Sequence, residues 1–249
     1  MPRAILITRA QEQGERSAER FAAAGYDVVH IPCIELVAPP DPAAFARAAA
    51  QVAMYDWVVL TSQNAVARLA EHAAVLPKIA AIGTETARAV EHAFGRAPDL
   101  VPGSHRGEAL AAELLAALGP APQRVVLYRA ARGRSVLPDA LAAAGHRLDL
   151  VIAYAVEPAY SQRTRLADWL AAHAADAPAA TIVFASSGTV DSFFVLAPPQ
   201  LPRTYRFACI SPVTAEALLA HGVTAAVTAQ EHTMGGLFRA LSAARSDVN

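Results

Sequence analysis

Short polar turns, each directly after an apolar run, are the stretches of this sequence best suited to chemistry. Residues 61–64 (TSQN) follow the run 57–60 (WVVL), and residues 186–188 (SSG) follow the run 182–184 (IVF). A short apolar run rich in β-branched residues is typical of a parallel strand buried on both faces. Hydroxyl and amide side chains in the turn that follows are typical of helix N-termini. Because open α/β sheets bind anions where a strand ends and a helix begins, both turns indicate an anionic ligand.

The same kind of turn follows other predicted strands, and together these turns define the expected binding residues. Arginine suits carboxylate recognition because its planar fork donates two parallel hydrogen bonds, so Arg132 and Arg134 are further candidates. Taken singly, each turn is also explained by helix capping, and each arginine by a solvated surface position. The whole set favours one shared anion-binding cleft. The expected substrate-binding residues are Arg9, Thr61, Ser62, Asn64, Gly83, Thr84, Thr86, Arg129, Ser186, Ser187, Gly188, Ser211 and Thr214.

Tyr154 is the candidate for proton transfer. It ends the predicted strand 148–154, directly before the proline-containing segment 157–159. A tyrosine there can donate a proton to a leaving hydroxyl, or it can pack with its hydroxyl hydrogen-bonded inside the protein. Both interpretations remain open from the residues alone.

Several common kinds of site are not indicated. The sequence contains no GxGxxG, GxxxxGK[ST] or GxSxG motif, and its eight histidines show no ligand-like pairing. We therefore expect no nucleotide, no metal, no hydrolase triad and no cofactor. Cys33 and Cys209 lie in or beside apolar strands and form no CxxC pair, so we expect buried free thiols rather than redox or nucleophilic groups.

Composition excludes other classes of partner. The net charge of −1 does not favour nucleic acid, so an anion site must be local. Hydrophobic residues make up 54% of the chain, much of it alanine, yet no apolar run approaches the roughly 18–20 residues that span a bilayer. The N-terminal MPRAILITRA is typical of a strand rather than a signal peptide. These features predict a cytoplasmic protein with no membrane contact.

Strands and helices alternate along the chain, which predicts doubly wound parallel sheets of the α/β class. Residues 35–42 contain three prolines and predict a semi-rigid linker, and residues 157–159 predict a second crossing. The predicted strands are 4–8, 27–31, 55–60, 78–82, 99–101, 124–128, 148–154, 182–184, 207–210 and 223–227. The predicted helices include 12–24, 43–52, 136–144, 163–174 and 234–244.

The two halves of the sequence repeat each other. Arg9 aligns with Arg129 and Gly25 with Gly145 at an offset of 120, while the two serine-containing turns align at an offset of 124. The turn at 210–214 aligns with 82–86 at an offset of 128. A twofold repeat of this length indicates a duplicated domain. By itself it places a boundary at the proline-rich segment 119–122.

Taken together, these motifs closely resemble the uroporphyrinogen-III synthase (hydroxymethylbilane cosynthase) family over nearly the whole chain. No single motif is specific, but their order and spacing are. The motifs are ILITR at 5–9, Gly25, Pro32, YDWVVLTSQNAV at 55–66, AIGTETA at 81–87, GHRLDLVIAY at 145–154, FASSGTV at 184–190 and ISPVTAEAL at 210–218.

The resemblance implies two flavodoxin-like domains joined by two linkers, with the active site in the cleft between them. One domain would comprise residues 1–36 and 158–249, the other residues 40–155, with linkers near 36–41 and 155–159. These boundaries replace the halfway boundary that the repeat suggested.

The resemblance also implies a reaction. The family dehydrates and cyclises hydroxymethylbilane without a cofactor, inverting the terminal ring through a spiro intermediate to give uroporphyrinogen III for haem biosynthesis. Tyr154 matches the tyrosine proposed to protonate the leaving hydroxyl. A monomer in transient contact with hydroxymethylbilane synthase is implied as well.

Two positions depart from the family pattern: Ser211 replaces a usual glycine and Ala185 a common threonine. One alternative is a non-catalytic, two-lobed binding or regulatory module for a small anionic ligand. Another is an FMN-binding flavodoxin in which residues 61–64 hold the phosphate.

Overall fold

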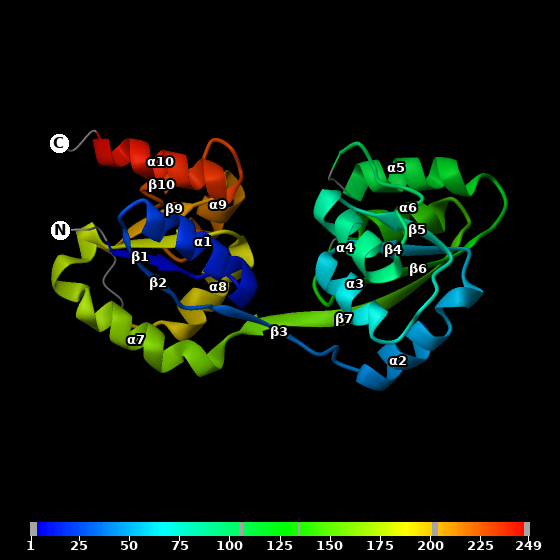
Figure 1. The fold of residues 1–249 in the computed structure, drawn as a ribbon, viewed down its shortest axis with the longest axis horizontal. Coiled ribbons are helices and arrows are strands. Elements are labelled where there is room, and N and C mark those ends of the chain that lie inside the picture. Colours follow the sequence, from blue (N-terminus) through cyan, green and yellow to red (C-terminus); the bar gives the residue numbers. More distant parts are fainter. Residues whose placement is uncertain (1–3, 105–106, 134, 201–203, 247–249) are drawn as a thin grey trace. The chain divides into compact units, whose positions relative to one another are not determined.

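The computed structural model describes residues 4–104, 107–133, 135–200 and 204–246, and it consists of alternating strands and helices (Figure 1). The chain divides into two compact units. Unit 1 comprises Met1–Leu36 and Glu157–Asn249, and unit 2 comprises Val37–Val156. The segment 119–122 lies inside unit 2, so the repeat's midpoint does not separate the two units.

Unit 1 contains a five-stranded sheet in the order β10-β9-β8-β1-β2, whose paired strands are parallel. Numbered along this unit, the order is 2-1-3-4-5, which is the flavodoxin-like order. The order reverses between β1 and β8, so a ligand site is expected where those two strands end. The strands are β1 Ala4–Ile7, β2 Asp27–His30, β8 Thr181–Phe184, β9 Arg206–Cys209 and β10 Val227–Thr228.

The second five-stranded sheet has the order β3-β7-β6-β4-β5 and belongs to unit 2, except that β3 and the end of β7 cross the boundaries with unit 1. A parallel bridge joins Leu100 to Ala80 beyond β5. If β6 is numbered 1, β7 is 2, β4 is 3, β5 is 4 and the Leu100 bridge is 5, the order is again 2-1-3-4-5. The strand β3 is an addition beside β7. The strand starts differ by the predicted offsets: 120 for β1 and β6, 124 for β4 and β8, and 128 for β5 and β9. The predicted repeat is therefore confirmed, with a circular permutation between the units. The strands are β3 Ile34–Val37, β4 Trp57–Leu60, β5 Lys78–Ala81, β6 Arg124–Ala130 and β7 Arg147–Pro158.

Helices cover both faces of each sheet, because successive strand residues point to opposite faces. In unit 1, Leu6 packs with α7, α8 and α9, whereas Ile5 and Ile7 pack with α1 and α10. In unit 2, Val58 lies in the core beneath α2, α3 and α4, and Val59 in the core beneath α5 and α6. The helices are α1 Gln11–Ala23, α2 Pro42–Ala50, α3 Gln63–Ala70, α4 Thr84–Phe94, α5 Gly107–Leu118, α6 Val136–Ala143, α7 Arg163–Ala172, α8 Ser187–Leu196, α9 Pro212–Ala220 and α10 Met234–Ser246. Short 3₁₀ turns occupy Val52–Met54, Tyr160–Gln162 and Ala174–Ala179.

Both segments predicted as inter-domain crossings contain or adjoin a boundary between the two units, but each is partly strand rather than irregular. β7 continues through residues 155–158, and β3 occupies the start of the segment 35–42 beside β7. The β-branched residues Val37 and Val156 suit extended backbone, and the prolines lie at or after strand ends, where a missing N–H donor is tolerated. In contrast, the predicted strand 223–227 is wrong except at its last residue, since β10 comprises only Val227–Thr228 and the Val223 amide instead donates to Leu218 O in α9.

Among the described residues, no helix is long and apolar enough to cross a membrane. Cys33 and Cys209 are free and fully buried, as predicted.

The hydroxyl of Tyr128 is fully buried in the core beneath α2 and α3, and it finds no hydrogen-bond partner among the described residues. A buried hydroxyl without a partner loses its hydration without compensation. We therefore expect Tyr128→Phe to raise the free energy of unfolding by about 1 kcal/mol in urea denaturation. The matched control is Tyr55→Phe, which removes the hydroxyl that donates to Asp149 Oδ2 at 2.7 Å. It should lower stability by about 1 kcal/mol. Equal losses in both variants would show that Tyr128 has a partner, such as a buried water.

Burial raises the pKa of Cys33 and of Cys209 to about 12. A thiol in the unfolded chain titrates near about 8.5, so above that pH the unfolded chain loses protons that the folded chain keeps. Stability from these thiols is therefore complete below about pH 8.5 and falls as the pH rises toward about 12. We expect a smaller loss of stability between about pH 7.5 and about pH 10 in the double variant Cys33→Ala, Cys209→Ala than in the unmodified chain. Identical losses would contradict this assignment.

Candidate functional site

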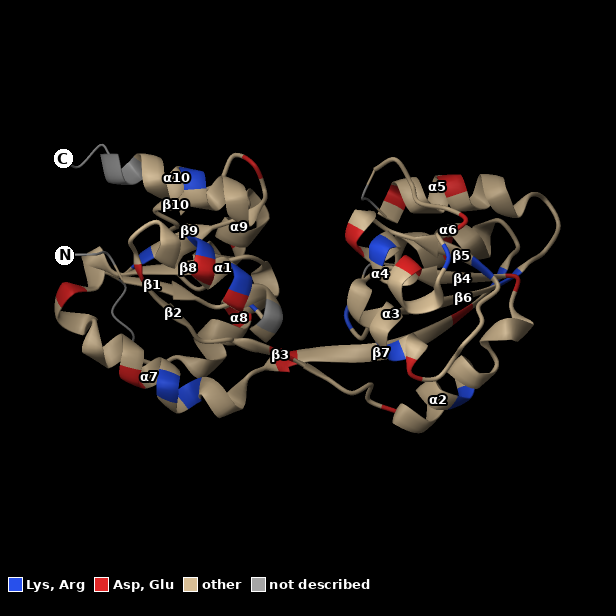
Figure 2. Cartoon of the chain, in the orientation of Figure 1, with Lys and Arg blue, Asp and Glu red and all other residues tan. Residues whose placement is uncertain are grey.

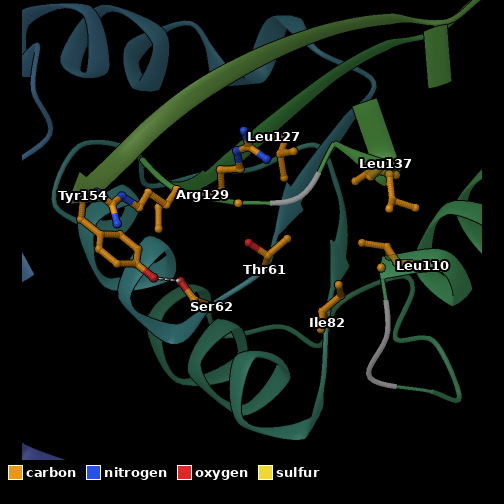
Figure 3. Close-up of a pocket in the computed structure, with 13 residues that line it drawn as sticks. Thr61, Ser62, Ile82, Leu110, Leu127, Arg129, Leu137 and Tyr154 are labelled. Atoms are coloured by element: carbon orange, nitrogen blue, oxygen red, sulfur yellow. Dashed lines mark hydrogen bonds between the residues drawn. The ribbon is translucent and has the colours of Figure 1, made fainter. Parts of the chain in front are cut away.

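A pocket of about 250 Å³ opens at the carboxyl ends of β4 and β6, where the strand order of unit 2 reverses (Figure 3). Its floor is apolar and includes side chains from β5–α4, α5, β6 and α6. Its polar groups come from the ends of β4, β6 and β7. The lining residues are Thr61, Ser62, Ile82, Gly107, Leu110, Leu127, Arg129, Ala130, Arg132, Gly133, Val136, Leu137 and Tyr154.

Tyr154 and Ser62 meet at one end of this pocket. The Tyr154 hydroxyl donates to Ser62 Oγ over 3.0 Å, and the Tyr154 side chain is only 7% exposed (Figure 3). Tyr154 comes from β7, two strands away from β4 in the sheet. The strand-end tyrosine and the serine turn, 92 residues apart in the chain, are thus brought together.

Ser62 is also the N-cap of α3. Its backbone is extended, with φ −158° and ψ 151°, and its Oγ accepts the Ala65 amide at 3.2 Å. This bond satisfies one of the free N–H groups at the start of the helix. Thr61 lines the pocket beside it, whereas Asn64 is half-buried within α3 and is not part of the pocket lining.

Arg129 and Arg132 supply positive charge to the pocket. Arg129 is half-buried at the end of β6, and its guanidinium lies against Gly133: a Cβ there would come within 2.9 Å of Arg129 Nη1. Arg132 is exposed. Arg134 lies outside the described residues. Elsewhere, acidic and basic residues alternate over each unit rather than gathering by sign in this view (Figure 2).

The remaining predicted turn of unit 2 begins α4. Gly83 is its N-cap with φ +80°, a conformation that favours glycine. Thr84 is exposed and Thr86 is buried, and neither contributes to the pocket lining. The equivalent Ser211 in unit 1 instead has an extended backbone, with φ −155°, and caps α9 through its side chain. The departure from glycine at this position therefore changes the turn's conformation.

In unit 1, each capping serine is hydrogen-bonded, among the described residues, only to groups of the helix that it caps. Ser186 Oγ accepts the Thr189 amide at 3.2 Å and pairs with Thr189 Oγ1 at 2.8 Å. Ser211 Oγ accepts the Thr214 amide at 3.3 Å and pairs with Thr214 Oγ1 at 3.1 Å. Ser187 and Gly188 form the first turn of α8. These turns lie at the ends of β8 and β9, on the same sheet edge as Arg9.

Arg9 follows β1 but points along α1. Its guanidinium donates to Gln13 Oε1 at 2.9 Å and to Ser17 Oγ at 3.3 Å. Burial, with a smaller effect of Arg16, lowers the pKa of Arg9. The equivalent arginines of the two units thus differ, because Arg129 lines a pocket and Arg9 is hydrogen-bonded to its own helix.

His30 and Gly14 fix the turn that carries Arg9, and neither was predicted from the sequence. The N-cap of α1 is Ala10, which makes no side-chain capping bond. Instead the His30 ring, at the end of β2, donates from Nε2 to the Arg9 carbonyl at 2.9 Å. The ring rests on Gly14, where a Cβ would lie 1.9 Å from Nε2. Only the pairing of β1 with β2 brings these residues together, so no local motif could reveal them.

No group of three or more His, Cys, Asp or Glu side chains within the described ranges could hold a metal ion. The polar groups that line the pocket are hydroxyls and guanidinium groups. This donor set suits an anion and a proton transfer rather than a cation.

The folds and the pocket define a two-domain protein of flavodoxin-like α/β units with a candidate site at a topological switch point. The sequence model described as Uroporphyrinogen-III synthase HemD matches residues 15–239. A uroporphyrinogen-III synthase of Synechococcus elongatus is 30% identical over 262 residues, which cover 95% of this chain and 93% of the relative. The chain belongs to the uroporphyrinogen-III synthase family, which is a family of cyclising lyases.

Solved structures support the same fold. A uroporphyrinogen III synthase of the extremely thermophilic bacterium Thermus thermophilus superposes with a TM-score of 0.61 at 21% identity, covering 98% of this chain and 99% of that one. The Helicobacter pylori enzyme gives a TM-score of 0.62 at 18% identity and covers 99% of each chain. The predicted family, fold class and enzyme class are therefore confirmed.

We expect the effect of Gly14→Ala on the free energy of unfolding to depend on residue 30. The substitution should be destabilising with His30 present and stabilising without it. With His30 present, the new methyl collides with the ring, and we expect the free energy of unfolding to fall by about 1–3 kcal/mol. In a His30→Ala background the collision is gone, and alanine's higher helix propensity should raise stability by about 0.5–1 kcal/mol. Urea denaturation of the four proteins measures both effects. The same effect of Gly14→Ala in both backgrounds would show that His30 does not rest on Gly14.

Proposed function

We propose that this chain converts hydroxymethylbilane into uroporphyrinogen III by losing water, inverting the terminal ring and closing the macrocycle. Membership of the uroporphyrinogen-III synthase family supports the reaction. The observation that carries the proposal is the Tyr154–Ser62 hydrogen bond at the end of a pocket that also contains Arg129. It joins a proton donor to a strand-end turn of the kind that binds anions.

In this proposal the leaving hydroxyl of the substrate departs as water, because a proton originating on Tyr154 reaches its oxygen as the C–O bond breaks. The resulting azafulvene is attacked by the terminal pyrrole, a C–C bond forms, and the ring inverts through a spiro intermediate. The pyrrole proton lost on closure restores the tyrosine. An unperturbed phenol has a pKa of about 10 and is a weak acid, so positioning of the flexible chain must supply much of the acceleration.

We propose that the hydroxyl- and amide-rich turns bind the carboxylates of the substrate. Their residues are the set predicted from the sequence: Arg9, Thr61, Ser62, Asn64, Gly83, Thr84, Thr86, Arg129, Ser186, Ser187, Gly188, Ser211 and Thr214. At about 250 Å³, the pocket is smaller than the roughly 300–1,000 Å³ that enclose a whole drug-sized ligand. It is therefore suited to one part of a linear tetrapyrrole.

The proposal extends to the setting of the reaction. On the family resemblance, the protein acts as a cytoplasmic monomer without metal or cofactor. Its substrate also closes to isomer I without the enzyme, which favours supply through transient contact with hydroxymethylbilane synthase.

A coupled assay tests this function. Hydroxymethylbilane is generated in situ, and the products are oxidised and separated as uroporphyrin isomers. Uncatalysed closure gives isomer I, so we expect the unmodified chain to give mainly isomer III. Loss of the phenol in Tyr154→Phe should lower kcat by about a hundredfold, the lower end of the roughly 10²–10⁴-fold that general acid catalysis contributes, because positioning supplies much of the rate.

The outcomes separate three interpretations. Isomer III with a normal rate from Tyr154→Phe would keep the enzyme and assign Tyr154 to packing. Isomer I alone from folded, unmodified protein would overturn the synthase proposal and favour a binding module for a small anionic ligand.

A further inference from the structure

Two hydrogen bonds meet on the oxygen of Ser62. Its Oγ accepts the Tyr154 hydroxyl at 3.0 Å and the Ala65 amide at 3.2 Å. A serine hydroxyl can accept two hydrogen bonds and donate one. Both acceptor positions are therefore in use, and the serine's own proton remains to be donated.

The pocket is where that proton can go. Ser62 lines the pocket, and within the described part of the chain no acceptor is found for its proton. The Tyr154 proton, in contrast, is already directed at Ser62 rather than into the pocket (Figure 3). A substrate hydroxyl in the pocket would thus meet the proton of Ser62 first.

We infer that Ser62 is a catalytic residue that passes the tyrosine's proton to the leaving hydroxyl; this inference rests on the proposed function. As the C–O bond of the substrate breaks, the leaving oxygen takes the Ser62 proton and departs as water. Ser62 takes the Tyr154 proton in the same step, and Tyr154 becomes a phenolate. The proton released when the macrocycle closes returns along the same path, so no co-reactant is needed.

The order of the two transfers follows from acidity. A serine hydroxyl is a weaker acid than a phenol, so it can give up a proton only while it receives one. Tyr154 is therefore still required as the source of that proton, and both Tyr154 and Ser62 line the same pocket as Arg129 (Figure 3).

The internal repeat shows that Ser62 is more than a helix cap. Ser186 and Ser211 cap helices in the same way, but each pairs with a threonine hydroxyl three residues later, Thr189 or Thr214. In unit 2 that position is Ala65, which has no hydroxyl. The hydroxyl partner of Ser62 comes instead from Tyr154, on another strand. Of these three capping serines, only Ser62 is joined to a proton donor outside its own helix.

Ser62→Asn and Ser62→Thr separate capping from proton transfer. Asparagine caps helices as well as serine does and accepts a hydrogen bond from tyrosine, but its amide cannot relay a proton. We expect Ser62→Asn to keep the thermal stability of the unmodified chain while kcat for isomer III falls by about a hundredfold, the lower end of the general acid contribution. Ser62→Thr keeps the hydroxyl and should retain most of kcat.

A double-mutant cycle with Tyr154→Phe completes the test. Groups on one proton path act as a unit, so the double variant should be about as slow as the slower single variant. The relay would be overturned if the kcat losses of the two single variants multiplied in the double variant. It would also be overturned if Ser62→Asn had a normal kcat. If the unmodified chain gives isomer III, such a result overturns the relay alone. If it gives only isomer I, the proposed function fails and the relay with it.

Discussion

Burial of the parallel strands on both faces is the constraint on which the rest of this structure depends. Residues 57–60 and 181–184 are buried at every position, so no polar side chain can be placed within those strands without a partner. The polar groups of the candidate site therefore lie at the ends of strands and in the first turns of helices. At the carboxyl ends of the strands they also face the free amide groups of the following helices. The positions of the candidate anion-binding turns and of the candidate proton donor follow from this arrangement.

Duplication provided two such edges, and the two edges have diverged. In unit 1 the turns are closed by internal bonds: Arg9 donates to Gln13, His30 donates to the Arg9 carbonyl, and two threonines pair with the capping serines. In unit 2 the switch point between β4 and β6 holds a pocket with Arg129 at its wall. The same fold thus carries one edge whose polar groups largely bind each other and one whose polar groups line a pocket.

The fold was predictable from sequence because its signals are local. Apolar runs, serine turns and terminating glycines mark the elements, and the repeat offsets recur unchanged between equivalent strands. What failed needed tertiary information. The proline-marked crossings at 35–42 and 157–159 contain or adjoin the boundaries between the units, but the prolines gave no sign that strand pairing extends β3 and β7 into both segments. The direction of the Arg9 side chain depends on Gln13 and Ser17, and the role of Gly14 depends on a histidine from the neighbouring strand.

The candidate site was predictable in its parts but not in its connections. Tyr154 and Ser62 were each recognisable as strand-end residues, yet their contact requires β6 to lie between β7 and β4. That order sets how far a side chain from the end of β7 must reach across β6 to meet the turn after β4. The absence of a hydroxyl at Ala65 then leaves an acceptor position on Ser62 for the tyrosine. With alanine rather than threonine three residues after the cap, Ser62 hydrogen-bonds Tyr154 of another strand as well as its own helix. The hydroxyl proton of Ser62 is still available for donation.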